Sequence, residues 1–299
     1  MDILYIAVNI MVFLALAPLF EGVIRKITAR VQSRQGPPVI QPYYDLLKLL
    51  GKQNMGPGGF AFKIAPMAAL ASILSVIVFL PLGYQDNALT SYADVITIIY
   101  LLTLGGVSVL LGALSSRNTY AQMGSSREMI TMIMVEPVLA MTFILGAVKV
   151  KSLGITESIF SITGAGYGAS AIIMLVVYLM ALMAFIGVKP FDIAEAEVEI
   201  LEGPFIEYSG PNYALFKYYL ILKQMFYAAV FVIAFIPAIK TGFYGADVLI
   251  QLAFIFVVYI FIALIGSTNP RLRIDQAQKF YAVLILASLV AVGLSVYGI

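Results

Sequence analysis

Six carboxylates lie close together in a chain that is otherwise strongly apolar. They fall within residues 189–208 and are Asp192, Glu195, Glu197, Glu199, Glu202 and Glu207. On an α-helix four of them would share an arc of about 80°, namely Asp192, Glu195, Glu199 and Glu202, and Glu197 would project to another side. Like charges this close cannot all ionise freely, so some are expected to hold protons near neutral pH. This pattern indicates that some of the carboxyl groups bind protons, and the simpler alternative is an acidic loop that only faces water.

The amino-acid composition is typical of an integral membrane protein. Of the 299 residues, 62% are hydrophobic and 11% are charged, far outside the range of a soluble globular domain. Eight apolar runs are long enough to cross about 30 Å of hydrocarbon. They lie near residues 2–22, 61–83, 95–114, 127–148, 169–188, 213–238, 246–266 and 277–298. We therefore predict an all-α, polytopic fold of about eight transmembrane helices, with residues 1–299 forming a single integral membrane domain.

The distribution of Lys and Arg predicts the orientation of these helices, because the cytoplasmic side of a membrane protein collects positive charge. The loops on one side are basic, whereas those on the other hold only Lys149, Lys151 and Lys240. The acidic segment belongs to the basic side. We therefore expect that segment in the cytoplasm and both termini outside the cell membrane. Topology explains the basic residues, so the charge balance does not point to nucleic acid.

Cysteine and histidine are both absent from the chain. It therefore lacks the usual ligands of iron–sulfur clusters, haem and zinc. It also lacks a glycine-rich phosphate loop, a Ser–His pair and a nucleophilic cysteine. We predict no catalytic residue, metal site or cofactor site in this chain. If it serves a redox process, partner subunits must carry the electrons.

Glu136 lies about midway along the fourth apolar run and is followed by Pro137. A charge at the bilayer centre costs about 2.5–3.5 kcal/mol on insertion scales, and proline frees a backbone carbonyl that can bind water. We predict a functional carboxylate, and the alternative is a protonated Glu136 that only donates an interhelical hydrogen bond. Lys223, inside the sixth run, is either an intramembrane partner or a side chain that extends to the interface.

The segment after the first apolar run, residues 25–50, is too long and too specific for a simple connector. Gly36-Pro37-Pro38 enforces a turn. Residues 41–50 then predict a short amphipathic interfacial helix, with its leucines against the membrane and Asp45 directed elsewhere. We predict a docking element here, and a purely interfacial helix is the alternative.

Three motifs in the sequence resemble those of a known family. They are Arg25-Lys26 with Gln32, Arg34-Gln35-Gly36-Pro37, Gln41-Pro42 and Asp45; Pro190-Phe191-Asp192 with the glutamates up to Glu207-Tyr208; and Asn269-Pro270-Arg271-Leu272-Arg273-Ile274-Asp275-Gln276. Together they resemble the membrane subunit of respiratory complex I that is often called subunit 1. The similarity is greater to its counterpart in energy-converting, membrane-bound NiFe hydrogenases and related archaeal complexes.

The resemblance implies a membrane-anchoring and energy-coupling subunit that links a cytoplasmic redox arm to antiporter-like, ion-pumping subunits. It implies a proton or ion path through Glu136, Asp192, Glu195, Glu197, Glu199 and Glu207, to which we add Glu202. It also implies that Arg25, Arg34, Arg271 and Arg273 line the docking side for hydrogenase-like or complex I-like cytoplasmic subunits. Iron–sulfur clusters and a NiFe centre would lie in those partners.

Other functions predict different features. Quinone-reducing relatives tend to carry an acidic residue directly before the Arg25-Lys26 pair, where this chain has Ile24. This departure argues against quinone binding. The resemblance implies a hydrogenase-type complex with ferredoxin as the electron donor, and a quinone-reducing complex or an archaeal sulfane-sulfur-reducing one is the alternative. A stand-alone cation transporter often contains paired broken helices, and we find no second copy of Glu136-Pro137 or of the acidic segment. A structural anchor is the third alternative, and it predicts that carboxylate substitutions affect assembly only.

Overall fold

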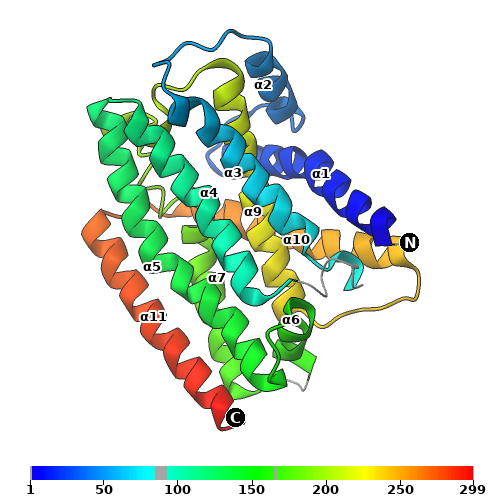
Figure 1. Ribbon diagram of the computed structural model, residues 1–299. Coiled ribbons are helices and arrows are strands. Elements are labelled where there is room, and N and C mark those ends of the chain that lie inside the picture. The colour runs from blue at the N-terminus through cyan, green and yellow to red at the C-terminus, as the bar shows by residue number, and fades with distance from the viewer. Residues whose placement is uncertain (1, 85–92, 165–166, 299) are drawn as a thin grey trace.

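The predicted apolar runs form helices in the computed structural model, which describes residues 2–84, 93–164 and 167–298 (Figure 1). Within these residues, eight helices are long and apolar enough to cross a membrane, so the chain is a multi-pass membrane protein. They are α1 (Asp2–Val31), α3 (Phe60–Val78), α4 (Val95–Ser115), α5 (Thr119–Val150), α7 (Ala169–Ile186), α9 (Gly210–Phe235), α10 (Tyr244–Thr268) and α11 (Ile274–Val296). The predicted all-α fold is confirmed.

Shorter helices lie between these spans. They are α2 (Gln41–Leu50), α6 (Ile155–Gly164) and α8 (Glu197–Ile200), with 3-10 turns η1 (Leu82–Tyr84) and η3 (Gly203–Phe205). The amphipathic helix predicted over residues 41–50 has the bounds of α2. It packs against α1 and α9.

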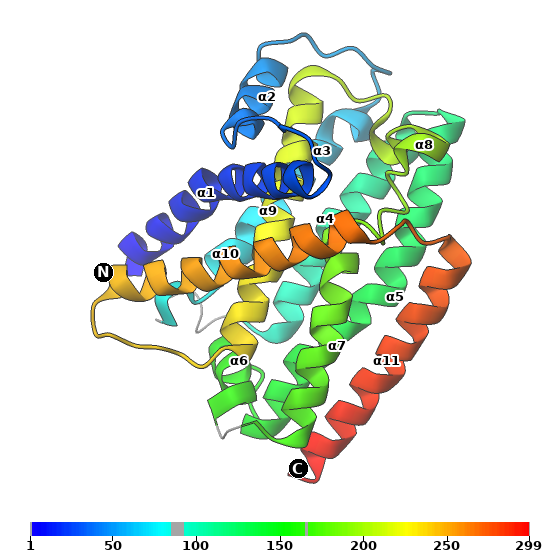
Figure 2. The same ribbon diagram turned by 180° about the vertical axis from the view of Figure 1, so that it is seen from behind.

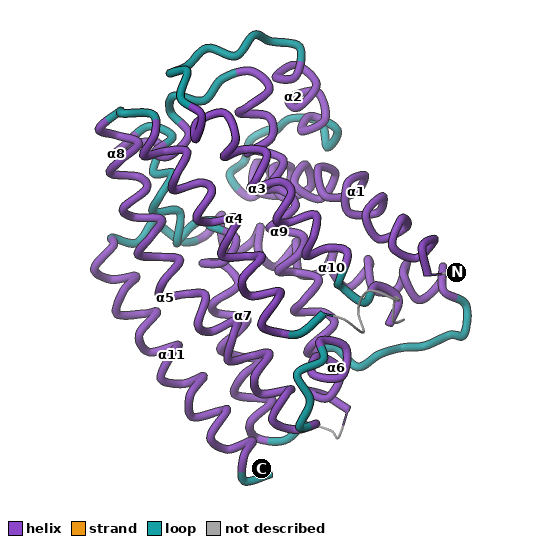
Figure 3. Tube along the Cα trace, viewed as in Figure 1, coloured by secondary structure: helices purple, strands orange, loops and turns teal. Residues whose placement is uncertain are grey.

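Helix α9 runs through the centre of the bundle and contacts α1, α3, α7 and α10. On one side α1 and α10 pack together, both steeply tilted relative to the other helices (Figure 2). On the other side α11 packs against α5 and α7. The loops of residues 32–59, 187–209 and 269–273 gather at the same end of the bundle, which we call the acidic-loop end (Figure 3).

The fourth span begins earlier than predicted, at Thr119 rather than near residue 127. Asn118 caps the helix, because its side-chain oxygen accepts a hydrogen bond from the Tyr120 N–H at 2.8 Å. The helix therefore continues through a polar segment beyond the apolar run. As a consequence Arg127 and Glu128 lie about two turns inside α5 instead of at the edge of the span.

The acidic segment is not a continuous helix, so the predicted shared arc of four carboxylates is wrong. Helix α7 ends at Gly187, whose φ of 71° lies in the left-handed region. Residues 187–209, the acidic loop, contain only the short elements α8 and η3. Gly203 has a φ of 51°, and a Cβ on it would lie 2.1 Å from the carbonyl oxygen of Ala194. Close packing of the loop on itself thus replaces helical geometry.

Candidate functional site

Three cavities meet at Glu195, at the inner face of the acidic loop. The first has a volume of about 60 Å³, the second about 270 Å³ and the third about 20 Å³, and Glu195 lines all three. A cavity of roughly 10–15 Å³ can hold one water molecule when polar groups line it. Each cavity is therefore large enough for water, and Glu195 is the residue that they share.

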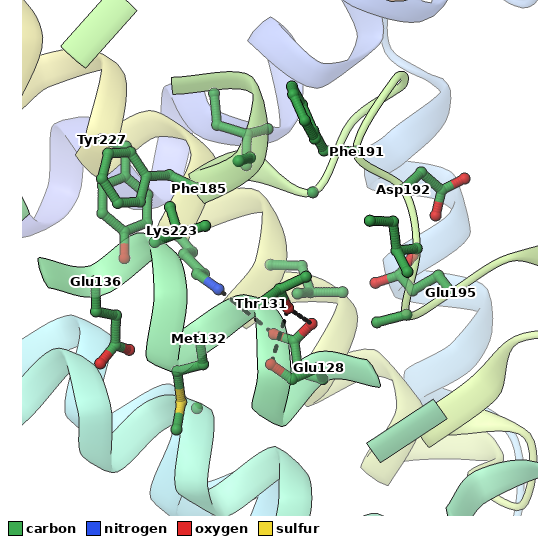
Figure 4. Close-up of a pocket in the computed structure, with 18 of the residues that line it drawn as sticks. Glu128, Thr131, Met132, Glu136, Phe185, Phe191, Asp192, Glu195, Lys223 and Tyr227 are labelled. Carbon is green, nitrogen blue, oxygen red and sulfur yellow. Dashed lines mark hydrogen bonds and ion pairs between the residues drawn. The ribbon is translucent and has the colours of Figure 1, made fainter. Parts of the chain in front are cut away.

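The first cavity extends from the acidic loop to Glu136 on α5 (Figure 4). Glu128, on the same helix, also lines it and lies about 12 Å from Glu136 along the helix axis. Lys223 of α9 points into this cavity, with its Nζ 3.9 Å from Oε1 of Glu128. The hydroxyl of Thr131 donates a hydrogen bond to Oε2 of Glu128 at 3.5 Å. Lys223 therefore has Glu128 as its ion-pair partner and shares the cavity with Glu136.

Glu195 lies between this cavity and the acidic-loop end. Its removal from bulk water, followed by the negative charge of Asp192, raises the pKa of Glu195 to about 8. The side chain is therefore largely protonated at neutral pH, as expected for at least some members of the acidic segment. A carboxyl group with a pKa near the ambient pH can both accept and release a proton.

The other described carboxylates of the loop bind partners within the chain or line a cavity. Asp192 accepts a hydrogen bond from Nη2 of Arg271 at 2.6 Å, and Glu207 accepts one from the Asn118 amide at 2.6 Å. Glu199 is exposed and accepts a 2.7 Å hydrogen bond from Arg127, which lowers the pKa of Glu199. Glu202 lines the second cavity. The side chain of Glu197 lies outside the described part of the chain.

The second cavity opens between α1, α9 and the acidic loop. Most of its lining residues are polar or charged, among them Glu21, Arg25, Glu195, Glu202, Lys217 and Gln224. Arg25 binds Glu21 at 3.0 Å and Asp45 of α2 at 3.2 Å, and Lys217 lies 3.8 Å from Asp45. Burial alone would raise the pKa of Asp45, but the hydrogen bond from Gln41 and the charge of Lys217 outweigh it and lower the pKa.

The predicted docking residues therefore divide into two groups. Arg25, Asp45 and Arg271 form ion pairs inside the chain, where they fix α1, α2 and the acidic loop. Arg34 and Arg273 are exposed at the acidic-loop end. The turn predicted at Gly36-Pro37-Pro38 does not form there, because the turns of this segment lie at residues 32–33 and 39–40. Gly36 has a φ of 67° and lies beside Ala29, where a Cβ would approach to 2.5 Å.

Two acidic residues of the site were not predicted from the sequence. Glu128 lies at the edge of the predicted fourth span, although its spacing from Glu136 places Glu128, Met132 and Glu136 on one face of a helix. Glu21 lies where the first span leaves the membrane, which suggests a plain interface position, but it lines the second cavity. Among the described residues, no group of three or more His, Cys, Asp or Glu side chains could hold a metal ion.

The chain matches the sequence model of the NADH dehydrogenase family over residues 3–296. It is similar to formate hydrogenlyase subunit 4 of Escherichia coli (strain K12), with 32% identity over 93% of this chain and 94% of that protein. Hydrogenase-4 component C of the same organism is 36% identical over 79% of this chain and 76% of that protein.

A solved structure gives the same result in three dimensions. A chain of the membrane-bound sulfane sulfur reductase, an archaeal respiratory membrane complex, superposes with a TM-score of 0.88 at 26% identity. The match covers 98% of this chain and 99% of that one. The chain thus belongs to the NADH dehydrogenase family of complex I subunit 1 and its relatives, and is a membrane subunit of a complex I-like complex.

Proposed function

We propose that this chain couples a redox reaction in cytoplasmic partner subunits to ion movement through antiporter-like membrane partners. The observation that carries the proposal is the position of Glu195 at the junction of three cavities. With Glu195 as their shared lining residue, these separate cavities extend from the polar space beside Arg25 to Glu136 inside the fourth span. A series of carboxylates separated by hydrated spaces is the arrangement that proton transfer requires.

Protons would enter through the second cavity, beside Glu21 and Glu202, and reach Glu195. From there Glu128 and Glu136 continue the path along α5. Lys223 supplies a positive charge next to the α5 carboxylates, which stabilises negative charge on this part of the path. A change of charge or conformation at the acidic loop would alter the protonation of Glu195, and the α5 carboxylates would carry that change into the membrane. The coupling is electrostatic and needs no covalent step.

In this proposal the acidic-loop end faces the cytoplasm and both termini face outward. The exposed Arg34 and Arg273 would contact a hydrogenase-like redox arm that holds the iron–sulfur clusters and a NiFe centre. The similarity to a formate hydrogenlyase subunit and a hydrogenase-4 component supports a hydrogenase-type complex. Reduced ferredoxin is the electron donor that the sequence resemblance implies.

The chemistry of the second cavity favours this assignment over quinone reduction. Five of its ten lining residues are acidic or basic, and Gln224 adds a further polar group. A quinone has an apolar ring and tail, and burying it among charged groups would remove their hydration without replacing it. Water fits this cavity better.

The test uses the native complex, purified and reconstituted in vesicles. Hydrogen evolution and quinone reduction would be assayed in parallel, together with ion uptake per turnover. Glu195→Gln should keep the subunits assembled and reduce ion uptake per turnover, whereas Glu157→Gln, an exposed change on α6, should behave as wild type. Normal ion uptake per turnover in Glu195→Gln would refute the proposed path.

A further inference from the structure

Arg127 binds the acidic loop at two points that flank Glu195. Its Nη1 donates a hydrogen bond to Oε2 of Glu199 at 2.7 Å and a longer one to the carbonyl oxygen of Ile193 at 3.4 Å. Ile193 precedes Glu195 by two residues and Glu199 follows it by four. Because a guanidinium group is planar with several N–H donors, one side chain can hold two acceptors in a fixed relative position.

A second contact between α5 and the loop lies one turn earlier on the helix. A Cβ on Gly124 would lie 2.7 Å from both the Cα of Gly203 and the Cδ of Pro204, so only glycine permits this approach. Gly203 packs in turn against the carbonyl of Ala194, the residue that directly precedes Glu195. The backbone around Glu195 is therefore held against α5 by packing on one side and by Arg127 on the other.

Helix α5 also carries the two carboxylates that share cavities with Glu195. Glu128 follows Arg127 directly in sequence, and Glu136 lies further along the same helix. Any displacement of the loop relative to α5 changes the separation between Glu195 and these carboxylates. From this geometry we infer that Arg127 is a positioning residue that sets the distance between Glu195 and Glu128 and transmits loop movement to α5. The inference rests on the proposed function.

A structural role for Arg127 makes a different prediction. Its side chain is 28% exposed and that of Glu199 is 54% exposed. Exposed ion pairs add little to stability, so a purely structural contact should be lost without consequence for coupling. The positioning role instead predicts a change in ion transfer with the fold retained.

The experiment compares Arg127→Gln, Arg127→Lys and the control Arg117→Gln in the reconstituted complex. Arg117 is an exposed arginine in the turn before α5, so its replacement removes the same charge nearby. Arg127→Gln should lower ion uptake per turnover by about fivefold, and Arg117→Gln should not lower it. Arg127→Lys should recover part of the loss, because lysine keeps the charge that binds Glu199 but lacks the planar, rigid guanidinium that fixes the positions of both acceptors.

The pH profile of ion uptake is a second measurement, and it should not change if Arg127 has only a structural role. The charged groups around Glu195 are Asp192 and Glu202 from its own loop, Glu128 of α5, Glu21 and Arg25 of α1, and Lys217 and Lys223 of α9. None of them is changed in Arg127→Gln. Release of the loop would hydrate Glu195, so the alkaline limb of the profile should shift to lower pH. Infrared difference spectra give a third readout. The carboxyl band of Glu195 is identified by its absence in Glu195→Gln, and it should shift in Arg127→Gln but not in Arg117→Gln.

The outcomes separate the two proposals. If Glu195→Gln pumps normally, the proposed path itself fails. If Glu195→Gln loses coupling but Arg127→Gln matches Arg117→Gln in uptake, pH profile and infrared band, only the positioning role is wrong. Should Arg127→Gln not assemble, Glu199→Ala removes the main acceptor while leaving the arginine. That variant must then show the same acidic shift of the pH profile, and an unchanged profile would overturn the inference.

Discussion

The two ends of the bundle both bury polar side chains, but they use them differently. At the end opposite the acidic loop a buried carboxylate, Asp247 of α10, is bound by the N–H and hydroxyl of Thr241 at 2.7 Å, and neutral groups make the contacts between distant segments. There, Asn9 of α1 donates a hydrogen bond to the Leu80 carbonyl at 3.0 Å and accepts one from the Tyr244 hydroxyl at 3.2 Å. Gln251 of α10 accepts one from the Gly83 N–H at 2.8 Å. These neutral groups join α1, η1 and α10 by direct contact.

Carboxylates dominate the acidic-loop end, and several of them face cavities. Glu128, Glu136 and Glu195 share one cavity with the ammonium of Lys223. Amide and hydroxyl pairs do not titrate near neutral pH, whereas a carboxyl in such a place can change its charge. The comparison teaches that buried polarity alone does not indicate function in this bundle. We expect titratable groups next to space for water to carry the function, and the predictions that follow test this distinction.

The largest effect is expected for Glu136→Gln. The amide keeps the shape and hydrogen-bonding capacity of the side chain but cannot titrate. Ion uptake per turnover should fall by about tenfold or more, while the complex stays assembled in the membrane. Simultaneous measurement of redox turnover and ion uptake in vesicles would check this. Normal uptake at normal turnover would leave Glu136 as a structural hydrogen-bond donor.

A smaller effect on ion uptake is expected when the pH is raised, and its direction follows from the pKa of Glu195. The pKa of Glu195 is raised to about 8, so the side chain loses its proton as the pH rises through that value. Uptake that depends on protonated Glu195 should decline on the alkaline side of pH 8 in the wild type. The decline should be absent from the low, residual uptake of Glu195→Gln. If uptake declines in the same way in both proteins, the decline is caused by a titratable group other than Glu195.

Removal of an exposed charge at the acidic-loop end should affect docking rather than transfer. Arg34→Ala is expected to weaken retention of the redox arm as salt increases, because salt screens exposed charge contacts. Lys151→Ala, an exposed cation at the other end, is the matched control. Retention of the redox arm on a sizing column at low and high salt would measure the difference. Equal retention of both variants at high salt would make the first loop a connector only.

The smallest effect on coupling is expected at the opposite end. Asn9→Ala removes buried hydrogen bonds and leaves the Tyr244 hydroxyl and the Leu80 carbonyl without that partner, so stability should fall by about 1–3 kcal/mol. Ion uptake per turnover should stay unchanged. Thermal denaturation of the purified complex and vesicle assays would test both parts. A loss of coupling in this variant would break the distinction between the two ends.

The spans and the family could be predicted from the sequence because both depend on local features. The length of an apolar run is sufficient to predict a membrane-crossing helix, and the three motifs identified the family that the comparisons confirm. The amphipathic repeat over residues 41–50 likewise predicted α2. Glu136 and Glu195 were named as site residues since charge is costly in an apolar segment and like charges interact when close in sequence.

Only the tertiary structure decided which charges face one another. The cap at Asn118 starts α5 before the apolar run, so Glu128 lies inside the helix and not at its edge. The contact between Gly203 and Ala194 gives the acidic loop a compact shape that no helical periodicity describes. Arg271 and Asp192 are far apart in sequence, but Nη2 of Arg271 lies 2.6 Å from Oδ2 of Asp192 in the fold. Such pairs depend on how distant helices pack, because the free energy of a charge inside a membrane protein is determined by its neighbours in space and by its access to water.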